Sequence, residues 1–82
     1  MTTDADIRAR IGGLVGEEKE LRQRLAAGEI SREEEHQRLR DLEAQLDQCW
    51  DLLRQREALR DAGRDENRAE VRSAKVVEDY LG

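Results

Sequence analysis

The chain has 82 residues, of which 43% are charged and 37% hydrophobic, with a formal net charge of −5 and no proline. This length allows one small domain over residues 1–82, whose single core would be marginal without a partner chain or very regular packing. The acidic balance argues against a nucleic-acid-binding protein, which normally carries a basic excess. Because the sequence has no run of about 18 apolar residues, no membrane-spanning segment is expected.

The opening stretch and the cysteine content bear on location. The stretch MTTDADIRAR has no apolar core, so it does not have the pattern of a secretory signal. A single cysteine allows no disulfide within the chain, which suits a reducing compartment. We therefore expect a cytoplasmic protein.

A first helix is predicted over residues 4–27. Thr3 and Asp6 have the spacing of a capping box at its start, and Gly28 has the place of the glycine that ends it. Apolar residues recur at alternating steps of four and three, which is the seam of a heptad repeat, interrupted by Glu18. The seam residues are Ile7, Ile11, Leu14, Leu21 and Leu25.

A second helix is predicted over residues 31–62, after a turn at residues 28–30. Ser31 and Glu34 have the spacing of a second capping box, and Gly63 is placed to end the helix. A turn this short makes the two helices run antiparallel. The second seam consists of Leu39, Leu42, Leu46, Cys49 and Leu53.

The two seams also predict a register. Across an antiparallel turn, the residue numbers of facing pairs add to a constant, and a sum of 60 brings four apolar pairs together. The pairs are Leu21 with Leu39, Leu14 with Leu46, Ile11 with Cys49, and Ile7 with Leu53. Cys49 is then a small buried hydrophobic residue, with no base or cation beside it to activate the thiol.

The remainder of the chain is predicted to be a charged loop over residues 63–72 and a short helix over residues 73–81. Ser73 can cap this helix, which carries Val76, Val77, Tyr80 and Leu81 on roughly one face. The predicted fold is all-α: a coiled-coil-like antiparallel two-helix hairpin with a short C-terminal helix. We expect it to dimerise into a four-helix bundle.

Two groups of residues mark a candidate interaction surface at the end of the hairpin away from the turn. Beside the seam of the second helix lie apolar residues that one partner helix cannot cover, namely Trp50, Leu52 and Leu59. The first helix carries a stripe of small residues on its outer face, namely Ala5, Ala9, Gly12 and Gly16. Such a stripe allows close helix approach, so we expect the last helix, a second copy or another protein to pack here.

Other residue patterns suggest chemistry only weakly. Glu33 and His36 have the Glu-x-x-His spacing of di-iron bundles, but the register places Ala27 and Arg24 opposite them, where such a centre needs carboxylates. Arginines recur every four residues from 56 to 72, interleaved with acids that nearly cancel their charge. With no phosphate loop, no metal-spaced cluster and no nucleophile beside a base, we expect no catalytic residues, no cofactor and no bound metal.

The stretch LEAQLDQCWDLLRQREALRDAG, residues 42–63, resembles a family of small actinobacterial proteins catalogued as domain of unknown function 2630. The resemblance extends to IRARIGGLVGEEKELR near the start and VRSAKVVEDYLG at the end, so it covers nearly the whole chain. Its most specific part is LDQCWDLLRQR. The family has no assigned activity, so the resemblance implies no functional residues.

Three functions agree with these observations. The first is a non-enzymatic cytosolic helical protein-interaction module, structural or regulatory, whose partner is a second copy or another protein. The second is a small-ligand sensor that controls a partner such as a sigma factor, with the arginines of helix two and the loop binding an anion. The third is a metal-binding helical bundle that uses Glu33 and His36. A thermal-shift panel of nucleotides separates the second from the first, and metal analysis separates the third.

Overall fold

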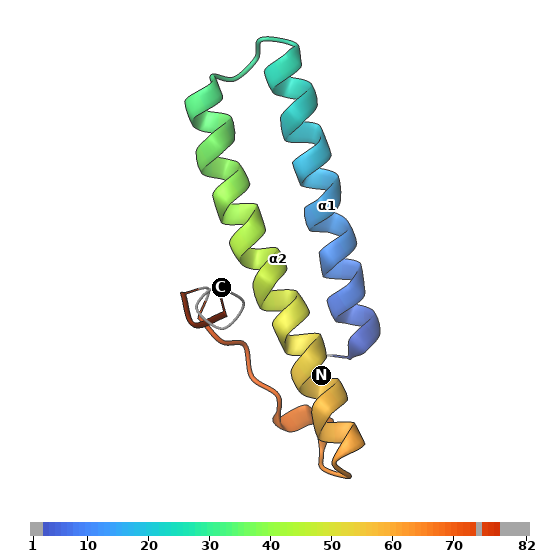
Figure 1. The fold of residues 1–82 in the computed structure, drawn as a ribbon. Coiled ribbons are helices and arrows are strands. Elements are labelled where there is room, and N and C mark those ends of the chain that lie inside the picture. Colours follow the sequence, from blue (N-terminus) through green and yellow to red (C-terminus); the bar gives the residue numbers. More distant parts are fainter. Residues whose placement is uncertain (1–2, 74, 78–82) are drawn as a thin grey trace.

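The protein folds as a helical hairpin with a C-terminal segment attached to its second helix. The structure, a computed structural model, describes residues 3–73 and 75–77. It contains the helices α1 (Asp4–Ala26) and α2 (Arg32–Asp61) and a 3-10 helix, η1 (Glu66–Arg68). Helices α1 and α2 lie side by side and antiparallel (Figure 1), and the described residues include no strand. The fold is therefore all-helical, as predicted.

Both long helices begin at predicted cap residues. The Thr3 hydroxyl accepts a hydrogen bond from the Asp6 N–H at 3.1 Å, and the Asp6 carboxylate accepts one from the Thr3 N–H at 3.0 Å. These reciprocal bonds are a complete capping box. At the second helix, the Ser31 hydroxyl accepts from the Glu34 N–H at 3.1 Å, which is half of the predicted box. The predicted helix ranges are one residue longer where they include the caps Ala27, Ser31 and Ala62.

Two glycines end the long helices in the same way. Gly28 and Gly63 have φ angles of 74° and 70°, in the left-handed region that L-residues adopt only with strain. The N–H groups of Gly28 and Glu29 donate to the carbonyls of Leu25 and Arg24, which is a Schellman motif. Gly63 and Arg64 repeat this pattern onto α2. Each motif satisfies terminal carbonyls and turns the chain back along the hairpin.

The core lies along the seam between α1 and α2. One cluster of buried residues, at the open end, contains Ile7, Ile11, Leu52 and Leu53; the other, towards the turn, contains Leu14, Leu21, Ile30 and Leu42. Leu46 and Cys49 pack against both clusters and are themselves partly buried. The ion pair between Asp4 and Arg56 obeys the predicted pairing sum of 60. The two core clusters combine residues of both predicted seams, although Cys49 is less buried than expected.

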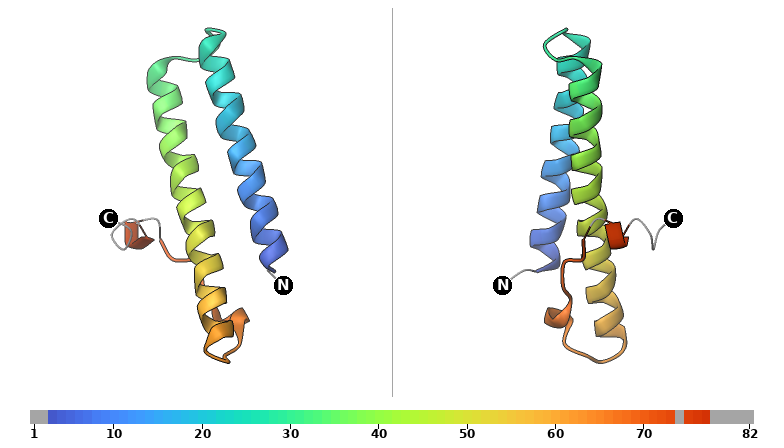
Figure 2. Two further views of the ribbon diagram at one scale, coloured as in Figure 1. Left: turned by 45° about the vertical axis from the view of Figure 1, so that its right-hand side comes forward. Right: turned by 90° about the vertical axis from the view of Figure 1, so that its left-hand side faces the viewer.

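After Gly63 the chain turns back and runs along α2. Within the predicted loop it forms η1, and it then reaches a helical stretch at residues 75–77. The Ser73 hydroxyl accepts a hydrogen bond from the Val76 N–H at 3.3 Å, so Ser73 caps this stretch as predicted. Figures 1 and 2 show the stretch at residues 75–77 beside α2, on the side away from α1. Tyr80 and Leu81, predicted for the same helix, lie outside the described residues.

Candidate interaction surface

Helix geometry divides the hairpin into two flanks on either side of its seam. Arg10 precedes the seam residue Ile11, Gln45 precedes Leu46, and their side chains form a hydrogen bond of 2.6 Å. Residues that precede seam positions therefore share one side of the antiparallel pair. A step of one residue rotates an α-helix by about 100°, so residues that follow seam positions share the opposite side. We call the first side the C-terminal flank and the second the tryptophan flank.

The C-terminal flank is covered near the open end by the chain's own C-terminal segment, residues 66–73. Ala69 packs against the core cluster that contains Leu52, and Val71 helps to line a groove of about 290 Å³ between the helices. Two glutamine side chains of α2 bond to the backbone of the segment. Gln55 donates to the Glu70 carbonyl at 2.7 Å and accepts from its N–H at 3.3 Å, and Gln48 donates to the Arg72 carbonyl at 3.1 Å.

A buried carboxylate completes this attachment. Asp51 is only 2% exposed, on the face of α2 that turns away from α1. Its carboxylate accepts hydrogen bonds from both Nε and an Nη of Arg72, and from Gln55 at 2.8 Å. The bonds from Arg72 hold the pKa of Asp51 below its ordinary value, against the opposing effect of burial. Arg72 therefore ties residue 72 of the segment to the middle of α2.

A second polar network joins the start of α1, the end of α2 and η1. Arg56 is 5% exposed and donates to the Asp4 carboxylate at 2.6 Å. Arg60 donates to the other Asp4 oxygen at 2.7 Å and to Glu66 at 2.8 Å. Hydrogen bonds from Arg56 and Arg60 lower the pKa of Asp4. Two arginines and two carboxylates thus share their charges where three elements meet.

These contacts bear on the predicted binding of an anion by arginines. Arg56, Arg60 and Arg72 were candidates to receive it, but each is paired with a carboxylate of its own chain. A ligand would have to displace these partners. The arrangement favours a role in folding for the three arginines, which leaves the exposed Arg64 and Arg68 of the predicted series.

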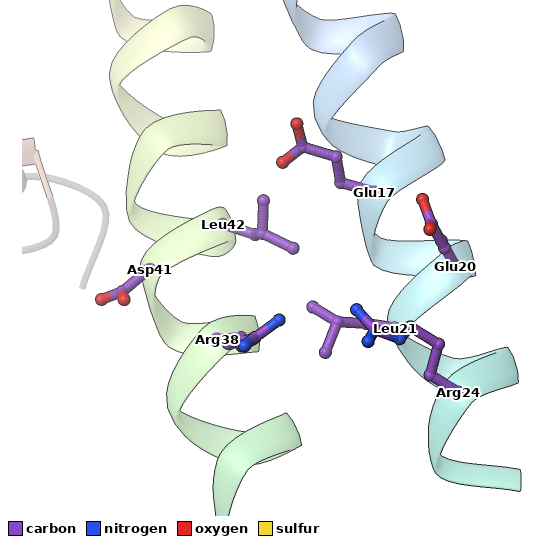
Figure 3. Close-up of a pocket in the computed structure, with 7 residues that line it drawn as sticks. All are labelled: Glu17, Glu20, Leu21, Arg24, Arg38, Asp41 and Leu42. Atoms are coloured by element: carbon purple, nitrogen blue, oxygen red, sulfur yellow. The ribbon is translucent and has the colours of Figure 1, made fainter. Parts of the chain in front are cut away.

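A second groove, also of about 290 Å³, lies on the C-terminal flank nearer the turn. Figure 3 shows Leu21 and Leu42 pointing toward one another at its floor, with the arginines Arg24 and Arg38 beside them. Glu17, Glu20 and Asp41 also line it, so positive and negative charges are mixed. Because neither sign of charge dominates, the groove does not select a charged ligand.

The tryptophan flank exposes the largest apolar side chain of the sequence. Trp50 follows the seam residue Cys49 and is 49% exposed, and Val15 follows Leu14 and is 52% exposed. Residues seven positions away occupy the same place on a helix. On α1 these are Arg8 and Arg22, and on α2 they are Glu43 and Glu57, all of them exposed. The flank therefore presents Val15 between basic residues on α1, and Trp50 on an α2 edge of mixed charge, because the exposed Arg40 and Arg54 also follow seam positions.

The structure separates the residues that were predicted to form one interaction surface. Leu52 is 9% exposed within the core, so it is not available to an outside partner. The reason is that the C-terminal segment covers it, and Leu59 on the same flank is partly buried. The small residues Ala5, Ala9, Gly12 and Gly16 are exposed, and a Cβ added at either of the two glycines would have no neighbour within 4 Å. No described part of the chain packs on those glycines.

Glu33 and His36, the candidate metal ligands, lie together on an exposed face near the turn. Arg32 and Arg40 line the same shallow surface, and their positive charges disfavour a cation there. Among residues 3–73 and 75–77, no group of three or more histidines, cysteines or carboxylates is placed to hold a metal ion. Nor does this part of the chain contain a helix that is apolar over enough of its length to cross a membrane.

Comparison with known proteins agrees with the resemblance in the sequence. The family described as "Protein of unknown function (DUF2630)" matches residues 3–82. The chain belongs to this family. An uncharacterized protein of Mycobacterium tuberculosis and another of Mycobacterium bovis are each 56% identical to it over 80 residues, covering 98% of this chain and 92% of each relative. No solved structure matches the chain.

The DUF2630 match includes both the hairpin and the C-terminal segment. The sequence did not predict which residues attach the C-terminal segment to α2. Gln48 and Gln55 bond to backbone carbonyls, and because every residue has a carbonyl, the sequence does not mark their partners. One signal was present: Asp4 and Arg56 satisfy the pairing sum of 60 and carry opposite charges. Extending the seam to polar residues would have predicted that ion pair.

Proposed function

We propose that this DUF2630 protein is a non-enzymatic helical protein-interaction module that acts in the cytoplasm in a structural or regulatory role. The observation that carries the proposal is the half-exposed Trp50 on a well-supported helix. Tryptophan is enriched among the residues that dominate binding energy at protein interfaces. An apolar side chain of this size gains most when a partner covers it.

The surroundings of Trp50 support this function. The hairpin is fixed at its ends by two Schellman motifs, and the charge network of Asp4, Arg56 and Glu66 holds its open end. A partner would therefore meet a helix surface that is already in place, which lowers the entropic cost of binding. The C-terminal flank is occupied near the open end by the chain itself, whereas Trp50 and Val15 remain exposed.

Site-specific photo-crosslinking in native cells tests the proposal. A photoreactive residue at position 54, exposed on α2 one turn from Trp50, should give a discrete adduct. A matched probe at Gln23, exposed on the outer face of α1, should not. Trp50→Ala should abolish the adduct at position 54 without reducing helix content. Absence of a Trp50-dependent adduct at position 54 would refute the interaction function.

A further inference from the structure

We infer that α2 carries a second interaction surface, which binds an extended segment of another protein and is occupied in the free chain by the chain's own C-terminal segment. The partner's segment carries a large apolar residue followed directly by an arginine. The surface consists of the glutamine stripe, formed by Gln48, Asp51 and Gln55, and of the groove beside it. This inference goes beyond the proposed function, because the surface does not include Trp50.

The glutamine stripe binds main-chain groups of the segment that lies on it. After η1, residues 69–73 form neither a helix nor a turn, and they run alongside α2 (Figure 1). The Gln55 side chain donates to the Glu70 carbonyl at 2.7 Å and accepts from the N–H of the same residue at 3.3 Å. Gln48 donates to the Arg72 carbonyl at 3.1 Å. Because every residue except proline has both groups, a different extended segment can form the same three bonds.

Asp51 adds selectivity for one side chain. Asp51 is 2% exposed, and its carboxylate accepts from the Arg72 Nε at 2.9 Å and from a second nitrogen of the same guanidinium. A guanidinium matches a carboxylate in this two-point geometry, whereas a lysine ammonium does not. Peptide-binding surfaces obtain affinity from main-chain bonds and specificity from pockets for particular side chains. The stripe combines these two features, and its pocket selects arginine.

The chain's own segment fills the groove beside the stripe incompletely. Side chains of an extended segment alternate, so Ala69 and Val71 face the same side. Ala69 packs against the core cluster at the open end, and Val71 lines the groove of about 290 Å³ together with Ile7, Cys49 and Leu52. Val71 is nevertheless 66% exposed. The groove therefore has room for a larger apolar side chain at the place of Val71, which would bury more apolar area than valine does.

The hairpin and η1 are held by contacts that do not involve residues 69–73. Both core clusters consist of residues from α1, α2 and the turn, and Ala69 is an added, partly buried contact. Arg60 donates to the Glu66 carboxylate of η1 at 2.8 Å, and Arg56 donates to the Glu66 carbonyl at 3.4 Å. A segment with few apolar contacts can open locally while the rest of a fold stays intact. Replacement of residues 69–73 by a partner therefore leaves the hairpin folded.

The covalent connection makes the chain's own segment a built-in competitor. A tethered segment acts at a high effective concentration, so a partner must bind the stripe more tightly than the segment does. Displacement also releases Val77, which is 1% exposed at the end of the described chain. A large apolar residue beside Leu52 supplies the partner with burial that Val71 lacks. The surface therefore selects segments that have both the apolar residue and the arginine, and rejects those with the arginine alone.

Binding of labelled peptides to the full chain tests the inference by fluorescence anisotropy. One peptide has the sequence of residues 66–73, ENRAEVRS, and a second has leucine at the place of Val71. The chain variant Arg72→Ala/Val77→Ser, called the released variant, weakens the hold of the chain's own segment. It should bind both peptides at least ~10-fold more tightly than wild type, the factor expected for one charge-assisted pair. The leucine peptide should bind more tightly than the valine peptide.

Matched variants assign the binding to the glutamine stripe. Arg68→Ala/Val76→Ser changes the same residue types at exposed positions and should bind the peptides like wild type. In the released variant, Asp51→Asn or Gln55→Ala should each weaken binding about tenfold. Gln55 is partly exposed, so its replacement keeps the test decisive if circular dichroism shows that Asp51→Asn unfolds the chain. Trp50→Ala should leave peptide binding unchanged, so this inference and the proposed function can fail separately.

Three results would overturn the inference. The first is that the released variant binds neither peptide, or binds them equally well with Gln55→Ala. The second is equal affinity for the valine and leucine peptides, which would show that the groove does not receive a larger residue. The third is a wild-type dimer that Gln55→Ala dissociates, which would show that the segment of a second copy occupies the stripe.

Discussion

At the residue scale, the pairing of Asp51 with Arg72 is the contact that attaches the C-terminal segment to α2. The carboxylate is nearly inaccessible, whereas about two-fifths of the Arg72 side chain is exposed. Removing the arginine would leave a buried carboxylate with Gln55 as its remaining donor among the described residues. The segment can relieve that cost by detaching, which would let water reach Asp51.

Arg72→Ala is therefore expected to lower the free energy of unfolding by about 1–3 kcal/mol, the usual cost of an unsatisfied buried polar group. Hydrogen exchange should accelerate at the amides of residues 66–73, while the turn-proximal part of α2 stays protected. Arg68→Ala removes an exposed arginine from the same segment and should change little. Similar exchange in both variants would show that the Asp51–Arg72 pair does not hold the segment.

The same pair predicts how stability depends on pH. Because Arg72 lowers the pKa of Asp51 below the ordinary value of 3.8, ionised Asp51 stabilises the folded state fully above that pH. Its contribution is lost as the pH falls from 3.8 through the lower folded-state pKa. Urea unfolding should show wild type more stable than Asp51→Asn at neutral pH, with a difference that shrinks below pH 3.8. A difference independent of pH would contradict this role.

At the element scale, the glycines of this chain perform two different tasks. Gly28 and Gly63 have positive φ angles at helix ends, where an L side chain is strained. Gly13 and Gly16 lie inside α1 with helical backbone, and a Cβ added at either would contact nothing within 4 Å. The first pair is required by the turns, whereas no backbone conformation or contact within the described chain requires the second pair.

Alanine substitutions should therefore act in opposite directions. Gly63→Ala should destabilise the protein by about 1 kcal/mol, because the left-handed conformation strains alanine. Gly16→Ala should stabilise it by about 0.5–1 kcal/mol, because alanine is the better helix former. Thermal unfolding followed by circular dichroism measures both. A loss of stability in Gly16→Ala would indicate that another helix packs closely on the small-residue stripe.

The elements also show what the sequence could reveal. The heptad seams, the caps Thr3 and Ser31 and the glycines after each helix predicted the hairpin, because they depend on local periodicity and backbone conformation. The docking of residues 66–73 depends instead on the glutamine side chains Gln48 and Gln55, which form hydrogen bonds with backbone carbonyl and N–H groups. Such contacts leave no periodic pattern. That is why the sequence left open whether the chain itself, a second copy or another protein covers Leu52, which the structure buries.

At the scale of the whole molecule, α2 is the central element. It contacts α1 along the seam, and it also contacts η1 of the C-terminal segment, which lies along one flank of the hairpin. Trp50 lies on the one side of the seam where the described chain leaves a large apolar residue of α2 half exposed. The family match spans all of these parts, which is consistent with their forming one unit.

The fluorescence of Trp50 tests most directly whether this flank is a free interaction surface, because the sequence contains no other tryptophan. In dilute solution, where the protein sediments as a monomer, the emission should be red-shifted and readily quenched by acrylamide. It should shift to shorter wavelength and become protected when a partner binds. A short-wavelength emission that resists acrylamide in the monomer would show that the chain already covers Trp50, and would contradict the account.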